Sequence, residues 1–125
     1  MRVLLDTQAA IAAYLGAPLP HKVAALFLDD STERMVSAAT IMEVAVKHTI
    51  GKSQVGEVEM QEAVRDLHLT VIPFEPHHAY RMFRLPLHHR DPFDRMIIAT
   101  AYEEGLPLVG ADRQFRRYRG LKVIW

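Results

Sequence analysis

The stretch Arg2-Val3-Leu4-Leu5-Asp6-Thr7 joins a short apolar run to an acidic residue and then to an alanine-rich segment. The run from Arg2 to Leu5 predicts a buried strand, and Thr7 to Leu15 predicts a helix that Gly16 and Pro18 end. The acid between them therefore follows a strand directly. Because ligands of α/β proteins gather beyond the carboxyl ends of the strands, Asp6 is a candidate site residue.

Outward from this stretch, short apolar runs alternate with segments of helical period. Because strands separated by helices require crossover connections, the residues predict an α/β sandwich with a mostly parallel sheet of about five short strands. No internal repeat or linker interrupts the pattern, so residues 1–125 are predicted to form a single domain. The further strands are expected at Met35-Val36, Thr70 to Ile72, Leu108-Val109 and Lys122 to Ile124. A further helix is expected through Ile41, Val44, Ala45 and His48, with the hydroxyls of Ser37 and Thr40 as caps and Gly51 as its end. The other helices are expected at about Lys22 to Leu28, Glu59 to Leu67, Pro73 to Arg84, Asp91 to Gly105 and Arg113 to Tyr118, with a loop from Leu85 to Arg90.

The composition excludes several classes of site. The 125 residues include no cysteine, which removes a disulfide scaffold, a thiolate zinc site and a cysteine nucleophile. Half of the residues are hydrophobic, and 15 basic residues balance 15 acidic ones. The first eighty residues are net acidic and the remainder net basic, which can place a basic rim beside an acidic pocket. With no signal peptide and no apolar run of membrane-spanning length, we expect a cytoplasmic protein without membrane contact.

Four acids stand at positions that the predicted fold would bring together. Asp6 follows the first strand, Glu43 lies one turn into the helix after the second, Asp94 is in the first turn of the helix after the loop, and Asp112 comes three residues past Val109. Carboxylates about 4 Å apart repel each other by roughly 1 to 4 kcal/mol, depending on the dielectric constant. A bound cation or proton uptake must relieve that repulsion. An all-oxygen site of this kind suits Mg²⁺ or Mn²⁺.

Each acid also has an explanation in local structure alone. Asp6 can cap the helix that begins at Thr7. Glu43 stands four residues before Lys47, which is the favourable order for an ion pair on a helix. The remaining explanations are an N-cap by Asp91 before Pro92, a favourable interaction of Asp94 with the helix dipole and a turn at Asp112. The joint placement of the acids, more than any one of them, therefore favours a site.

Other motifs are absent or weak. The chain has no H-E-x-x-H, G-x-S-x-G, G-x-x-x-x-G-K-[ST] or G-x-G-x-x-G run, and Asp6-Thr7-Gln8 lacks the second acid of the D-x-D phosphatase loop. The pairs His77-His78 and His88-His89 lack the spacing of a helical zinc site and are expected to be surface or loop imidazoles. The scattered aromatic residues are assigned mainly to the core, namely Tyr80, Phe83, Tyr102, Phe115 and Trp125.

The sequence resembles the PIN-domain nucleases, and specifically the VapC-like toxins of toxin–antitoxin pairs. Four segments that span the chain in the family's order carry the resemblance. They are Val3-Leu4-Leu5-Asp6-Thr7, Val36-Ser37-Ala38-Ala39-Thr40-Ile41-Met42-Glu43-Val44-Ala45, Leu87-His88-His89-Arg90-Asp91-Pro92-Phe93-Asp94-Arg95-Met96-Ile97-Ile98-Ala99 and Gly105-Leu106-Pro107-Leu108-Val109-Gly110-Ala111-Asp112. Each segment alone is modest, whereas the ordered set is specific.

The resemblance implies a three-layer α/β/α sandwich and a metal-dependent endoribonuclease. The four motif acids correspond to Asp6, Glu43, Asp94 and Asp112, which would bind Mg²⁺ or Mn²⁺ and form the catalytic pocket, with Asp91 as an outer-shell group or a cap. The resemblance also implies homodimers, an RNA substrate and a small antitoxin that covers the pocket. The basic residues near the motifs are candidates for RNA contacts, and they are Lys47, Arg90, Arg95, Arg113, Arg116 and Arg117.

One position departs from the family pattern. Many members have Thr or Ser two residues before the fourth acid, where this chain has Gly110. A hydroxyl contact to a metal ion or water is therefore expected to be lost, which makes Asp112 the weakest of the four assignments. Two alternatives to the nuclease are a non-catalytic PIN-like module that binds a partner protein and a metal-dependent phosphatase, the latter disfavoured by the missing D-x-D.

Overall fold

A computed structural model describes all residues, 1–125. Its sheet contains five strands in the order β3-β2-β1-β4-β5, and every neighbouring pair is parallel. The predicted parallel sheet of five short strands is therefore confirmed. Strand β1 lies at the centre, so the residues that follow it are at the middle of the carboxyl edge. The strands are β1 (Arg2–Leu5), β2 (Glu33–Ser37), β3 (Thr70–Ile72), β4 (Leu108–Val109) and β5 (Val123–Ile124).

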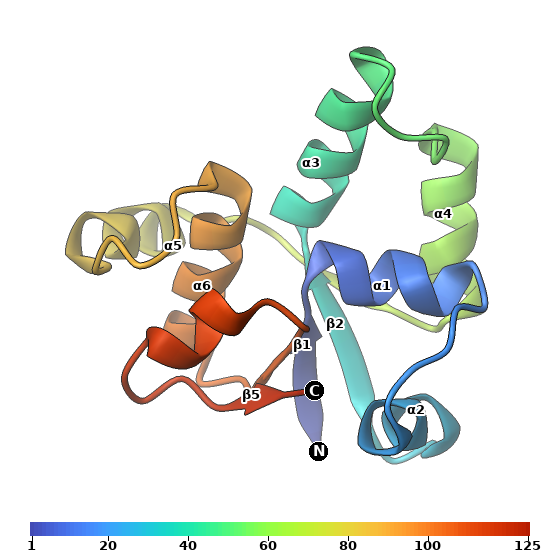
Figure 1. Cartoon of the computed structure of the whole chain (residues 1–125), viewed down its shortest axis with the longest axis horizontal. Coiled ribbons are helices and arrows are strands. Elements are labelled where there is room, and N and C mark those ends of the chain that lie inside the picture. Colours follow the sequence, from blue (N-terminus) through green and yellow to red (C-terminus); the bar gives the residue numbers. More distant parts are fainter.

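Helices cover both faces of the sheet, which confirms the three-layer arrangement (Figure 1). Alternate residues of the central strand enter different cores, because successive side chains of a strand point to opposite faces. Leu4 packs with the helix that contains Ile97 and Ile98, whereas Val3 and Leu5 pack with helices of the other layer. The helices are α1 (Thr7–Tyr14), α2 (His21–Leu28), α3 (Ala38–Thr49), α4 (Glu57–Asp66), α5 (Pro76–Arg81) and α6 (Pro92–Glu104), with 3₁₀ helices η1 (Met82–Arg84) and η2 (Arg113–Arg117).

Helix α3 continues from the carboxyl end of β2 and rises above the edge of the sheet (Figure 1). It packs against α6 on one side and against α1 and α4 on the other. The Ser37 hydroxyl caps α3 by accepting a hydrogen bond from the Ala39 N–H at 3.0 Å. This position puts one face of α3 over the ends of the strands.

Helix α6 has the start and stop that its sequence predicts. The Asp91 carboxylate caps it by accepting from the N–H groups of Phe93 and Asp94, with Pro92 in the first turn. Gly105 ends the helix with φ of 64°, a left-handed conformation that glycine adopts without strain. No helix of the protein combines the length and apolar character that a membrane crossing would require.

The segment after β3 differs from its prediction. The helix expected from Pro73 to Arg84 begins only at Pro76 and changes to the 3₁₀ helix η1 after Arg81. Leu85 is extended there because it precedes Pro86, and residues before proline avoid helical conformations. The assignment of Tyr80 and Phe83 to the core was wrong, because these side chains are exposed on α5 and η1.

Candidate metal centre

The fold brings the four candidate acids to the carboxyl edge of the sheet. Asp6 follows β1, and Asp112 follows β4, which pairs with β1. Glu43 and Asp94 come from α3 and α6, which pack against each other. Each of the other three carboxylates acts electrostatically on Asp6, so all four lie near one another, around one acidic site. The structure thus brings together all four residues that the sequence singled out.

Asp6 serves the local fold with one oxygen and leaves the other without a hydrogen bond. Its side chain is 3% exposed, and Oδ1 accepts a hydrogen bond from the Ala9 N–H at 2.7 Å, which caps α1. Burial raises the pKa of Asp6 to about 7, against the lowering effect of the Ala9 N–H and with a further rise from the neighbouring carboxylates. The charged form of Asp6 is therefore disfavoured until a cation compensates it.

Glu43 is the most informative of the acids. It is 3% exposed, and Lys47 Nζ lies 2.6 Å from its Oε2, so the predicted ion pair on α3 exists. The hydrogen bond that Lys47 donates to Glu43 raises the pKa of Lys47. The second carboxylate oxygen, Oε1, is buried and has no hydrogen-bond partner. Buried polar atoms in native proteins almost always have a partner, so this oxygen indicates an interaction that protein atoms do not supply.

Asp94 and Asp112 share one hydrogen-bond donor. His89 Nε2 lies 3.0 Å from Asp94 Oδ2 and 2.8 Å from Asp112 Oδ2. Burial raises the pKa of Asp94 to about 6, with a lowering effect from His89 and a raising effect from the nearby carboxylates. Burial acts to raise the pKa of Asp112 as well, but hydrogen bonds from the Gln114 N–H and His89 outweigh it and hold that pKa below its ordinary value.

Gly110 forms part of the wall of this pocket. Its backbone N–H donates to the Ile124 carbonyl, and its α-carbon faces the Asp6 carboxylate and the Phe115 ring. A Cβ atom at this position would stand 2.8 Å from Phe115 Cε2. A Thr or Ser side chain, which the family pattern places here, would therefore clash with these neighbours. Close packing thus accounts for the glycine, and the hydroxyl of the family pattern is lost with it.

The donor set fits a hard divalent cation. Asp6 Oδ2 and Glu43 Oε1 are not used in hydrogen bonds, and only one oxygen of Asp94 is bound to His89. The site offers carboxylate oxygens and no sulfur or unprotonated imidazole nitrogen. Oxygen ligands of this kind are those that Mg²⁺ and Mn²⁺ prefer. Asp91 uses Oδ1 to cap α6 and acts on the pKa of Asp94, which agrees with a supporting position.

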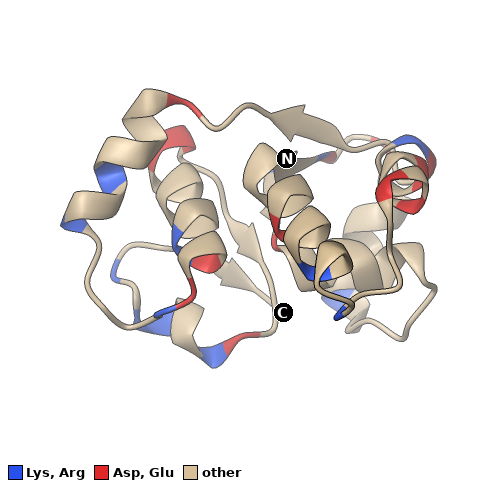
Figure 2. Ribbon diagram, turned by 90° about the horizontal axis from the view of Figure 1, so that it is seen from above, with Lys and Arg blue, Asp and Glu red and all other residues tan.

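The six basic candidates divide into two groups. Lys47 is paired with Glu43, and the Arg95 guanidinium donates to four backbone carbonyls, those of Met82, Leu85, Pro86 and His89. Both residues thus have partners within the protein. The other four candidates, Arg90, Arg113, Arg116 and Arg117, are exposed. Acidic and basic positions occur on both halves of the ribbon, so the charge asymmetry along the sequence does not separate them in space (Figure 2).

His89 was missed by the sequence analysis, which assigned it to the surface or a loop. It lies in the predicted loop from Leu85 to Arg90, but its side chain is only 12% exposed and points between two acids. Its position five residues before Asp94 was the only signal in the sequence. The same assignment was also wrong for His78, which is fully buried and lies 2.8 Å from Glu104.

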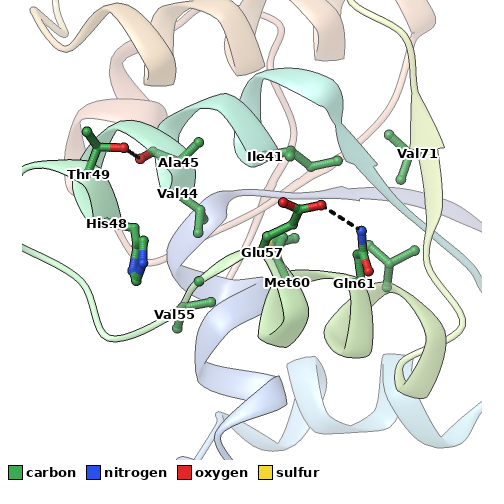
Figure 3. A pocket seen from close by; sticks show the side chains of 12 residues that line it. Ile41, Val44, Ala45, His48, Thr49, Val55, Glu57, Met60, Gln61 and Val71 are labelled. Carbon is green, nitrogen blue, oxygen red and sulfur yellow. Dashed lines mark hydrogen bonds between the residues drawn. The ribbon is translucent and has the colours of Figure 1, made fainter.

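An apolar pocket lies between α3 and α4 (Figure 3). Its volume is about 610 Å³. Side chains of α3 and of α4 face each other across it, and Glu57 and Gln61 are joined by a hydrogen bond at its rim. The apolar lining includes Ile41, Val44, Val55, Met60 and Val71. Helix α3 thus contributes Val44 to this pocket and Glu43, the preceding residue, to the acidic site.

Comparison with known proteins identifies the fold. The sequence model of the family described as PIN domain matches residues 3–121. No curated protein matches the chain.

Among similar solved structures, that of VapBC2 from Rickettsia felis bound to a promoter DNA fragment has a TM-score of 0.76 at 19% identity, covering 100% of this chain and 99% of the other. That of DNA-bound VapBC from Salmonella typhimurium has a TM-score of 0.73 at 22% identity and coverages of 99% and 97%. That of VapBC-5 from Mycobacterium tuberculosis, a member of the VapBC family of toxin–antitoxin systems, has a TM-score of 0.64 at 18% identity and coverages of 98% and 97%.

Proposed function

This chain belongs to the PIN domain family, and on that basis we propose that it is a metal-dependent endoribonuclease, the toxin of a toxin–antitoxin pair. One observation carries the proposal. The buried Oε1 of Glu43 has no partner, and Glu43 lies near three further acids, of which Asp6 and Asp94 have raised pKa values. A divalent cation supplies both the missing partner and the missing positive charge.

Three carboxylates are proposed to hold the cation, namely Asp6 through Oδ2, Glu43 through Oε1 and Asp94. Asp112 supports this group through its contact with His89. A bound Mg²⁺ or Mn²⁺ supplies a Lewis acid that polarises a phosphoryl oxygen and lowers the pKa of water for in-line attack. The protein holds the carboxylates in place before the cation arrives, because Asp6 is fixed by its cap on α1 and Glu43 by Lys47.

The substrate phosphates are proposed to meet the exposed arginines next to the acids. Arg113, Arg116 and Arg117 belong to η2, directly after Asp112, and Arg90 precedes the cap of α6. Their guanidinium groups can form paired hydrogen bonds with phosphate oxygens. Arg95 is left out of this set, because backbone carbonyls already occupy its donors.

The apolar pocket between α3 and α4 is proposed to bind a segment of the antitoxin. The VapBC structures similar to this chain come from toxin–antitoxin systems, and the pocket lies on the helix that contains Glu43. The exposed side chains of Ile41, Met42, Val46 and Ile50 extend the apolar surface along α3. An amphipathic segment bound there would contact the helix that contains Glu43. Assembly of the toxin into homodimers stays a prediction.

The proposed activity is tested with single-stranded RNA, in Mg²⁺ and in EDTA. We expect cleavage products only with Mg²⁺, and none from the variants Asp6→Asn and Asp94→Asn. Asp66→Asn is the matched control, because Asp66 is exposed and pairs only with its neighbour Arg65. A protein that only binds a partner would yield no products in either condition. A phosphatase would release phosphate from monoesters and leave internal RNA bonds intact, and either result would contradict the proposal.

A further inference from the structure

His89 is held in the pocket by contacts that do not involve the acids. Its backbone N–H donates to the Tyr118 hydroxyl at 3.0 Å, and its carbonyl accepts from Arg95 at 3.3 Å. Its ring stacks on Phe115, with 5.9 Å between the ring centroids. The loop before it is fixed in the same way, because the Pro86 carbonyl accepts from both Tyr118 and Arg95. The ring therefore has one position, set by the surrounding fold.

The hydrogen bonds of His89 determine which ring nitrogen is protonated. The Asp91 backbone N–H points at Nδ1 from 3.1 Å, and a backbone N–H can only donate. Nδ1 must accept, so the ring proton is on Nε2. A histidine that binds a metal ion normally donates its other N–H to a carbonyl or carboxylate, and this ring has the opposite arrangement. His89 Nε2 is therefore a hydrogen-bond donor with no lone pair for a metal ion.

That donor stands between two of the candidate acids. Nε2 lies 3.0 Å from Asp94 Oδ2 and 2.8 Å from Asp112 Oδ2, and these three atoms are within 4.8 Å of one another. A divalent ion bridging the two carboxylates would need oxygens at about 2.1 Å, in the space that the N–H occupies. The second oxygen of Asp112, Oδ1, already accepts a hydrogen bond from the Gln114 N–H at 2.8 Å and is held in the cap of η2.

A second histidine in the protein shows the same arrangement. The buried His78 accepts a hydrogen bond from the Glu75 N–H at Nδ1, at 2.9 Å, and its Nε2 lies 2.8 Å from Glu104. The group formed by His77, His78 and Glu104 has the spacing of metal ligands, but His78 is a donor there. It thus provides a natural comparison for His89, away from the acidic pocket.

We infer that His89 is a positioning residue that takes the place of a second cation, so that the acidic pocket binds one divalent ion and not two. The inference rests on the proposed metal-dependent function. Asp6, Glu43 and Asp94 hold the ion with the oxygens left free, while the Nε2–H of His89 holds Asp94 and Asp112 together. Asp112 then acts by orienting His89 and is not a ligand of the ion.

The test is a titration with Mn²⁺, in which electron paramagnetic resonance counts free ions and calorimetry measures affinity. The wild-type protein is expected to bind one ion. His89→Ala opens the space between Asp94 and Asp112 and leaves both charges, so this variant is expected to bind two. His89→Phe keeps the ring volume and the packing on Phe115 and should still bind one. His77→Ala, in the group away from the pocket, is the matched control and should equal the wild type.

A second variant keeps the inference testable if His89→Ala does not fold. Asp112→Asn keeps one acceptor oxygen, which can serve His89 if the amide gives up the hydrogen bond from the Gln114 N–H, so the protein should still bind one Mn²⁺, with affinity lowered by about ten- to a hundredfold. Two ions in the wild type, loss of the only ion in His89→Ala, or a loss of more than about a hundredfold in Asp112→Asn would each overturn the inference. With two ions and intact RNA cleavage, the proposed nuclease would stand. With no ion bound and no cleavage, the proposed function would fall together with the inference.

Discussion

Gly110 lies so close to Asp6 that a Cβ atom added to it would stand 2.7 Å from Asp6 Oδ2. A real Cβ atom cannot approach an oxygen that closely, so the absence of a side chain at Gly110 permits the position of the acid. The contact explains why a hydroxyl-bearing residue does not occur here. Gly110, which directly follows β4, thus affects the position of Asp6, a proposed metal ligand.

Gly110→Ala is therefore expected to displace Asp6 and weaken both folding and metal binding. Overpacking at such a position costs about 1–3 kcal/mol of the free energy of unfolding, which urea denaturation in EDTA measures. The control is Ala111→Ser, at an exposed neighbour, which should change that free energy by less than about 0.5 kcal/mol. If Gly110→Ser bound Mn²⁺ more tightly without loss of stability, the packing argument would be wrong.

Asp6→Asn is expected to stabilise the protein in EDTA while it abolishes cleavage. The amide oxygen can still accept from the Ala9 N–H, whereas the charge that burial and the other acids disfavour is removed. Asp6→Ala loses the cap as well and should lie about 1 kcal/mol below Asp6→Asn in free energy of unfolding. Thermal melts in EDTA at pH 8 make the comparison. A lower melting temperature for Asp6→Asn than for the wild type would make Asp6 mainly a structural cap.

The stability of the metal-free protein is expected to fall as the pH rises from about 4 to about 7. The pKa of Asp6 is about 7 in the fold against 3.8 for a free side chain, so the folded state binds its proton more tightly than the unfolded chain does. The sign follows from linkage, because stability falls with pH wherever the folded state holds more protons. The loss from Asp6 alone amounts to at most about 4 kcal/mol.

This pH dependence is measured as the change in melting temperature on adding Mg²⁺. The change should be small at pH 5, where protons already neutralise Asp6, and larger at pH 8. Asp6→Asn serves as the control for the histidines and other groups that titrate in the same range. Equal pH profiles for the wild type and Asp6→Asn in EDTA would show that Asp6 is not the group responsible.

Lys47→Met should destabilise the metal-free protein through Glu43. Removing the amine leaves a carboxylate that is 3% exposed without its one partner. Because Lys47 is itself partly exposed, we expect a loss of about 1–3 kcal/mol, less than for a fully buried pair. The double variant Lys47→Met with Glu43→Gln should recover most of it in EDTA. Equal stabilities of the single and double variants would mean that Glu43 finds another partner.

Arg95 is expected to contribute to folding stability, and Arg113 to RNA binding. Arg95→Gln breaks hydrogen bonds to four carbonyls and should cost about 1–3 kcal/mol in stability, with the slope of RNA binding against salt unchanged. Arg113→Gln should leave stability unchanged and reduce that slope by about 1, as loss of one phosphate contact does. The measurements are urea denaturation and RNA binding at several salt concentrations. An unchanged slope for Arg113→Gln would exclude a phosphate contact there.

The sequence alone predicted the elements whose signals are local. The strands at Thr70–Ile72 and Leu108–Val109 have the predicted bounds, and α6 begins after Asp91 and ends at Gly105. Capping, proline and glycine act within a few residues, so they can be read along the chain. The acids were found for the same reason, since each follows a strand closely or lies in the first two turns of a helix. The explanations of these acids by local structure were also correct for Asp6, Asp91 and Asp112, because each of them caps a helix with one oxygen.

The tertiary structure decided which side chain meets which. The sequence does not show that His89 reaches two acids, that Arg95 holds the loop before it, or that Gly110 packs against Asp6. These contacts join residues from different elements, and they depend on the path of a loop and on how layers pack. Backbone preference is a property of neighbours in the chain, whereas hydrogen bonding and close packing depend on distance in space. The chain thus determined where its acids stand, and only folding determined which of their oxygens stay free.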